Sequence, residues 1–325
     1  MSSAETADWY RRFGEHEARG NSPIFEQWAL GVATDDDILA LLETLPLQKR
    51  QPNLVFACAR LLGAPLGDYA VLKPWLLDNW AAVADEAQKR STQTNEPLRC
   101  ATLLPALALI PGPLALLEVG ASAGLCLYPD RYSYRYSGGD ILDPTSGRST
   151  VLLASATTGS VPVPAALPEI VWRAGIDTNP LDVRSDDDMH WLETLLWPEQ
   201  HERRQRLTAA IEIAKADPPR LLRGDAIAAL PGLVAEAPDD ATLVIVVSAV
   251  LVYLVAADRA RFVDTVEATG ADWISLEGYG ALPVVAAAMP GEPPAGNGKG
   301  MFVLALNQKP LAWTGPHGQS LDWIG

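Results

Sequence analysis

The sequence contains few cysteines, and they are not arranged for a disulfide framework or a metal site. Cys58, Cys100 and Cys126 are the three cysteines among 325 residues, and no two of them form a C-x-x-C pair. An odd number of widely spaced cysteines is typical of a reducing compartment. We therefore expect a cytoplasmic protein without a bound metal.

Secretion and membrane signals are also missing. The first thirteen residues include four charged side chains and no apolar segment, unlike a signal peptide. The longest apolar run, residues 243–257, is shorter than the roughly 20 residues that span a bilayer. These features predict a protein with no membrane partner.

Basic side chains are scarce relative to acidic ones. The chain has 25 lysines and arginines against 40 aspartates and glutamates, a net charge of −15. This excess repels polyanions, and the one short basic run, residues 203–206, lies in a charge-mixed helical stretch. We expect no nucleic-acid partner. The composition is that of a folded globular protein and leaves the oligomeric state open.

The first feature that the chain does contain is helical periodicity, which extends over residues 1–112. Ser22 and Pro23 open one amphipathic stretch, and Thr34 before three aspartates predicts a helix N-cap. Prolines and a glycine at 105–113 end the pattern. We predict a helical N-terminal domain over residues 1–112.

Residues 113–325 show a different pattern, in which short apolar runs alternate with helical stretches. This alternation predicts an α/β domain with a mostly parallel sheet. Two final runs around residue 308 predict a closing antiparallel hairpin. The expected strands are 114–119, 169–174, 221–223, 242–247, 272–276 and 301–306, and the expected helices are 186–216, 225–236 and 257–269.

The strongest motif is Leu-Leu-Glu-Val-Gly-Ala-Ser-Ala-Gly-Leu, residues 116–125. A buried strand carries Glu118 near its end and passes into a small-residue turn with Gly120, Ser122 and Gly124. Glycine lets the backbone approach a ligand closely. We expect the turn to open a helix whose N–H groups point at the site.

Two cofactors use turns of this kind. The dinucleotide pattern G-x-G-x-x-G fails, because serine and leucine stand where its second and third glycines belong. This disfavours a nicotinamide-dependent oxidoreductase. The spacing acid-x-Gly-x-small-x-Gly fits, and it resembles motif I of class I S-adenosylmethionine (SAM) dependent methyltransferases. A tight turn without a ligand is the alternative.

Two later acids match this resemblance in order along the chain. In methyltransferases of this class, an acid after the second strand binds the ribose hydroxyls, and an acid or amide after the third meets the adenine amino group. Asp177 and Asp225 stand at these positions. The resemblance therefore implies that both bind the cofactor, although Asp225 also suits a helix N-cap.

Several segments together resemble an uncharacterised bacterial family, domain of unknown function 2332. They are Glu-Val-Gly-Ala-Ser-Ala-Gly-Leu, Asp-Arg-Tyr, Arg-Ala-Gly-Ile-Asp-Thr-Asn-Pro, Trp-Pro and Arg-Gly-Asp. The resemblance covers most of the chain and implies a Rossmann-like SAM-binding domain over residues 113–325, with no established substrate. Members often carry a histidine where this chain has Val247. If that histidine is catalytic in relatives, this chain has lost or changed an activity.

The substrate side of the site has weaker signals. Residues 130–136 alternate aromatic and polar side chains, which predicts an extra strand or hairpin beside the glycine turn. We expect Arg131 or Tyr132 to line the pocket of the methyl acceptor, unless the segment is only a surface hairpin. Candidate catalytic residues are Ser248 and Tyr253, after the fourth predicted strand, and His190, which also suits a surface or packing role.

These observations predict a SAM-dependent methyltransferase that acts on a small molecule. The sulfonium of SAM carries the reactivity, so the protein chiefly needs to orient the acceptor, which explains why no catalytic base stands out. A non-catalytic SAM-binding sensor or interaction protein with the same fold is the alternative.

Overall fold

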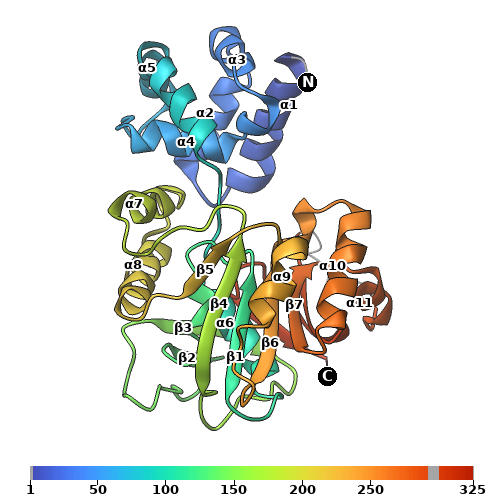
Figure 1. The fold of residues 1–325 in the computed structure, drawn as a ribbon. Coiled ribbons are helices and arrows are strands. Elements are labelled where there is room, and N and C mark those ends of the chain that lie inside the picture. The colour runs from blue at the N-terminus through green and yellow to red at the C-terminus, as the bar shows by residue number, and fades with distance from the viewer. Residues whose placement is uncertain (1–2, 292–299, 325) are drawn as a thin grey trace. The chain divides into compact units, whose positions relative to one another are not determined.

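The structure is a computed structural model, shown in Figure 1, and it describes residues 3–291 and 300–324. Eleven α-helices and ten β-strands form within these residues. Every helix in this part of the chain is too short or too polar to cross a membrane.

The chain divides into two compact units. A helical unit contains Met1–Thr94 with Asp186–Gln205, and a sheet unit contains Asn95–Ser185 with Arg206–Gly325. The division therefore differs from the boundary predicted at residue 112, because the chain leaves the helical unit earlier and later returns to it.

Side-chain caps explain where the helices of the first unit begin. The Ser22 hydroxyl accepts a hydrogen bond from the Phe25 N–H. Asp35, and not Thr34 as the sequence predicts, caps the next helix, because its carboxylate accepts from two N–H groups of the first turn. The helices are α1 (Ser3–Phe13), α2 (Pro23–Val32), α3 (Asp36–Glu43), α4 (Pro52–Leu61), α5 (Tyr69–Lys89), α7 (Asp186–Thr194) and the first part of α8 (His201–Ala216).

Aromatic rings fill the core of the helical unit. The ring of Phe56 lies 5.2–6.4 Å, centroid to centroid, from those of Tyr10, Phe13, Phe25 and Trp28. Such edge-to-face contacts add to the free energy gained by burying these large side chains.

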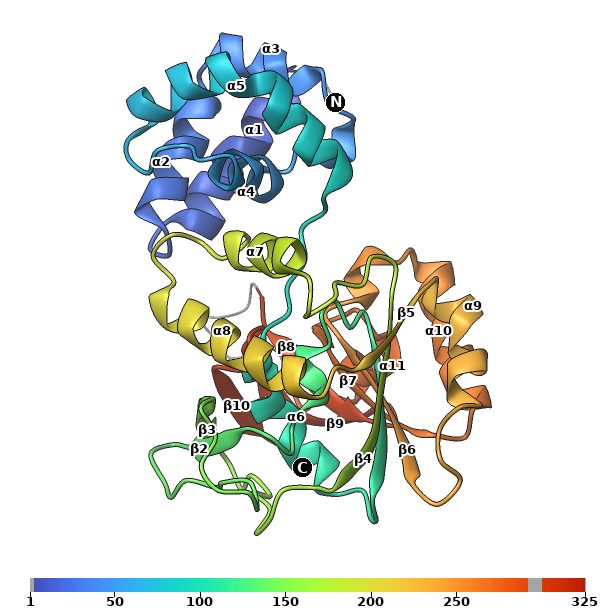
Figure 2. The same cartoon turned by 60° about the vertical axis from the view of Figure 1, so that its left-hand side comes forward.

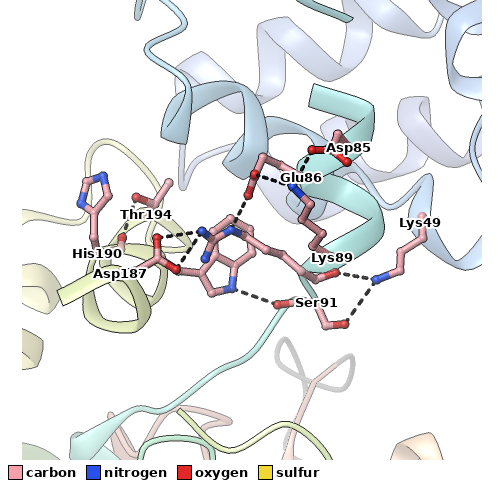
Figure 3. Close-up of polar contacts among 10 residues, drawn as sticks. Lys49, Asp85, Glu86, Lys89, Ser91, Asp187, His190 and Thr194 are labelled. Atoms are coloured by element: carbon pink, nitrogen blue, oxygen red, sulfur yellow. Dashed lines mark hydrogen bonds and ion pairs between the residues drawn. The ribbon is translucent and has the colours of Figure 1, made fainter. Parts of the chain in front are cut away.

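Helix α7 packs on the helical unit. Trp191 is buried in the core of that unit, and Arg60 donates to the carbonyls of Thr194 and Leu196 at the end of α7. Arg90, at the end of α5, binds both carboxylate oxygens of Asp187 (Figure 3). The helical periodicity of α7 shows that one face of this helix is buried, but it does not show which core the face packs against. On sequence alone, α7 was therefore placed in the other domain.

The sheet unit is a mixed α/β structure built on one ten-stranded sheet. From edge to edge the strands are β2 (Ser133–Tyr136), β3 (Leu152–Thr158), β10 (Ser320–Trp323), β9 (Lys309–Thr314), β8 (Phe302–Leu306), β7 (Asp272–Gly278), β6 (Thr242–Ser248), β1 (Leu114–Val119), β4 (Ile170–Asp177) and β5 (Arg220–Arg223).

Most neighbouring strands are parallel, which confirms the predicted α/β class. Strands β5, β4, β1, β6 and β7 all run in one direction, so their carboxyl ends lie at one edge. The predicted closing hairpin is β8–β9, and its turn residues Asn307 and Gln308 both have positive φ, as a tight two-residue hairpin turn requires.

Helices cover both faces of the sheet, as Figures 1 and 2 show. One face is covered by α9 (Ala226–Val234), α10 (Ala256–Ala268) and α11 (Pro283–Ala288), which bury Leu230, Phe262 and Val285 in a common core with the strands. The other face is covered by α6 (Cys100–Leu107) and the end of α8.

The predicted insert forms an added edge strand, and its Tyr134 also makes one antiparallel bridge to Leu142. Tyr134 lies in β2, which pairs in parallel with β3, and a parallel pair requires a long connection between its strands. Strands β3 and β10 were not predicted, because their short runs lack a continuous apolar pattern.

Candidate functional site

The glycine turn is a tight loop held against the end of β4. Gly120, Ser122 and Gly124 have φ values of 74°, 53° and 74°. The N–H groups of Gly120 and Ala121 both donate to the carbonyl of Ile176. A serine in the left-handed region carries some strain, and such residues often mark functional loops.

The helix that we expected after this loop is absent. A single 3₁₀ turn, Leu125–Leu127, follows Gly124. The Leu125 N–H donates to the side-chain oxygen of Asn95, and Pro129 lacks the N–H that a longer helix would use. The loop therefore presents no helix N-terminus to a ligand.

The loop also matches the G-x-S-x-G pattern of hydrolase nucleophile elbows, with Ser122 as the nucleophile. That chemistry needs an exposed serine between a strand and an α-helix. Ser122 is 3% exposed, and a 3₁₀ turn follows it. The geometry does not favour a serine hydrolase.

Asp177 joins the glycine loop to the end of β4. Its Oδ2 accepts from the Ser122 N–H at 2.8 Å, and its Oδ1 accepts from the Asn179 N–H at 2.7 Å. The side chain is half-buried. Each carboxylate oxygen has a second lone pair, so Asp177 can also accept hydrogen bonds from a ligand hydroxyl.

Glu118 points into the protein and lacks a full set of partners. The residue is 4% exposed, and its Oε2 has no hydrogen-bond partner within the described residues. Burial raises the pKa of this carboxyl well above its usual range; the nearby Cys126 adds to the increase and Arg99 opposes it.

Ser248 ends β6 on the same face of the sheet as Glu118. The register pairs Glu118 with Val246, and side chains two residues apart in a strand share a face. The Ser248 hydroxyl is buried and has no partner in the part of the chain that the structure describes. Two unsatisfied polar side chains thus lie on neighbouring strands.

Arg99 contributes a buried charge that sequence reasoning missed. Its Nη1 donates to the Ser248 carbonyl and its Nε donates to the Pro316 carbonyl. The residue lies in a 3₁₀ turn before α6, in a segment with no motif. Its position near Glu118 depends on contacts between segments far apart in sequence, so no local signal marks it.

Glu277, at the end of β7, holds the segment that follows β6. Its Oε1 accepts from the N–H groups of Val250 and Leu251 at 2.8 and 3.1 Å, and its Oε2 is buried without a partner in the described residues. Burial raises the pKa of Glu277 to about 7, although these two amides and Arg99 oppose the increase.

Val250 packs directly over the glycine loop. A Cβ added at Gly120 would lie 2.2 Å from the Val250 Cγ2. Gly120 is therefore required by its positive φ and also by a contact with the protein itself.

The other predicted residues lie in several places. Asp225 is exposed and caps α9 by accepting from the Ala228 N–H, so the predicted capping role is present. Tyr253 is 83% exposed on a 3₁₀ turn. His190 is exposed and belongs to the helical unit. Of the three catalytic candidates, Ser248 is the one whose position on the sheet is next to Glu118.

Arg131 and Tyr132 do not lie together at one pocket. Tyr132 is fully buried, and its hydroxyl donates to the Leu125 carbonyl. Arg131 is exposed and lines a cavity of about 330 Å³ beside Asp217. Because Asp217 lies three residues before the first residue of β5, this cavity lies toward the beginning of that strand and not toward its carboxyl end.

Comparison with known proteins relates the chain to one protein family. No curated protein and no solved structure matches the chain. A family model described as an uncharacterised protein conserved in bacteria (DUF2332) matches residues 7–323, almost the whole length. The chain belongs to this bacterial family.

Proposed function

We propose that the protein is a SAM-dependent methyltransferase acting on a small molecule. The order of the five parallel strands, β5-β4-β1-β6-β7, corresponds to the order 3-2-1-4-5 of doubly wound sheets. Ligands of such sheets bind outside the carboxyl ends, where the strand order reverses, here between β1 and β6. The glycine loop directly follows β1, and this placement is the observation that carries the proposal.

The residues around the loop suit the polar groups of SAM. Glu118 has a buried oxygen without a partner, which would accept hydrogen bonds from the ammonium group. Asp177 retains lone pairs for the ribose hydroxyls, and the exposed Asp225 is open to the adenine amino group. Gly120, Ser122 and Gly124 supply the close backbone approach. When bound, SAM supplies an electrophilic methyl group.

The segment after β6 has to move for a ligand to reach Gly120. The Val250 side chain occupies the space above this glycine, and Glu277 binds the Val250 and Leu251 amides. Displacing Val250 would open the glycine loop next to Ser248. Binding is therefore expected to be coupled to a shift of this segment.

Isothermal titration of the full chain with SAM and with S-adenosylhomocysteine tests the proposal. We expect Asp177→Asn to weaken binding by about 1.5–3 kcal/mol, because it removes the charge from a hydrogen-bond acceptor. Asparagine keeps one oxygen that can accept from the Ser122 or the Asn179 N–H. The variant therefore disturbs the loop less than Asp177→Ala would. Asp182→Asn, an exposed acid further along the same connection, is the matched control.

Equal affinity in the Asp177 and Asp182 variants would assign Asp177 to loop architecture alone. Absence of heat with millimolar SAM and folded protein would refute the proposal as a whole.

A SAM-binding protein without transferase activity is the second candidate. The position of one catalytic candidate favours it, because Tyr253 is 83% exposed. Binding of SAM without turnover against a pool of metabolites would support this candidate over the first.

A further inference from the structure

A cavity of about 270 Å³ lies within the helical unit, separate from the glycine loop. Two arginines, a histidine, a glutamate and a leucine line it: Arg60, Arg204, His190, Glu193 and Leu66. All of them belong to the helical unit. The volume is at the small end of the range of ligand pockets, so the cavity suits a compact molecule.

Arg60 is held in place by groups that leave part of its guanidinium open. Its Nη1 donates to the carbonyls of Thr194 and Leu196, and its guanidinium lies 5.9 Å from the centroid of the Phe25 ring. These contacts fix its orientation but contain no carboxylate. Arg60 and Arg204 both line the cavity, so two like charges face one region. Burial and the charge of Arg204 lower the pKa of Arg60 to about 10.

Arg204 brings a second guanidinium to the same cavity. Its Nε is buried and has no hydrogen-bond partner among the described residues. Arg90 of the same unit differs, because Glu86 and Asp187 both bind it (Figure 3). A partly buried guanidinium without a carboxylate costs free energy that a bound anion would recover.

The His190 imidazole is also available. Its ring takes no part in the contacts drawn in Figure 3, while its backbone carbonyl accepts from the Thr194 hydroxyl. Two carboxylates limit the positive charge: Glu193 lines the cavity, and Glu199 acts on Arg60 from nearby.

We infer that this cavity binds a small phosphate monoester through Arg60 and Arg204, with His190 at the same opening. Guanidinium groups match the geometry of phosphate oxygens with paired hydrogen bonds. Leu66 gives the carbon portion of such a ligand an apolar wall. The inference is independent of the proposed SAM site, because the two sites lie in different units.

Titration of the full chain with inorganic phosphate at low ionic strength, followed by ³¹P NMR, tests this inference. We expect saturable binding, and we expect Arg204→Gln to weaken it roughly tenfold or more. Arg203→Gln is the matched control, because this neighbouring arginine does not line the cavity. Arg204→Lys should bind with intermediate affinity, since lysine keeps the charge but loses the paired geometry.

Thermal unfolding without phosphate should show that the variants are folded, since the Arg204 Nε has no hydrogen-bond partner to lose in the described part of the chain. Non-saturable binding, or an equal loss in the Arg203 and Arg204 variants, would overturn the site. Malonate is a small dianion of similar size to a small phosphate monoester, but it carries two carboxylates. Tighter binding of malonate than of phosphate would overturn the assignment to a phosphate monoester.

Discussion

Gly120→Val is expected to destabilise the sheet unit by about 2–5 kcal/mol. A β-branched residue at a φ of 74° costs about 1–2 kcal/mol. The new Cβ would lie 2.2 Å from the Val250 Cγ2, and forcing extra atoms into packed surroundings costs about 1–3 kcal/mol more. Urea denaturation monitored by circular dichroism measures the loss as a lower transition midpoint.

The two causes can be separated. Gly120→Ala keeps the backbone strain and the clash, whereas Gly120→Ala combined with Val250→Ala removes the clashing methyl group and keeps the strain. We expect the double variant to recover part of the loss after correction for Val250→Ala alone. A wild-type midpoint for Gly120→Val would contradict the loop geometry. The sequence predicted a close approach of a ligand to this glycine, whereas the structure places the Val250 side chain of the protein itself against it.

The sequence predicted the central strands well because buried parallel strands are continuous apolar runs. Strand β1, Leu114–Val119, has the predicted bounds, and the predicted run at 242–247 is extended in the structure only by Ser248. Strand β3 was missed because its seven residues include Ser155, two alanines and two threonines, and its partner β10 lies far away in sequence.

The candidate site was partly predictable for a topological reason. Glu118, Asp177 and Ser248 follow or end parallel strands, and the carboxyl ends of adjacent parallel strands meet at one edge. Arg99 could not be found in this way, because its place beside Ser248 results from packing between distant segments. The missing helix after Gly124 also depends on a distant residue, Asn95, which binds the first N–H of the turn.

Glu277→Gln is expected to remove a pH dependence of stability. The folded protein raises the pKa of Glu277 from 4.5 to about 7, so it binds this proton more tightly than the unfolded chain does. The stabilisation from Glu277 is complete below pH 4.5 and is lost as the pH rises through about 7. A pKa difference of this size corresponds to about 3 kcal/mol of unfolding free energy.

The effect is measured as the unfolding free energies of the wild type and the variant, from a pH below the ordinary pKa of 4.5 to a pH above the raised value of about 7. Glutamine keeps an oxygen for the Val250 and Leu251 amides and cannot ionise. The variant should therefore lose less stability than the wild type as the pH rises. Glu267→Gln, at an exposed position on α10, should follow the wild type.

Glu118 also has a raised pKa, but it is present in both proteins, so the difference between their curves isolates Glu277. Parallel curves for the wild type and Glu277→Gln would mean that the carboxyl is solvated in solution. In that case Glu277 would not hold the amides of Val250 and Leu251 in solution. The segment with Val250, which covers Gly120, could then move away without the cost of breaking these two hydrogen bonds.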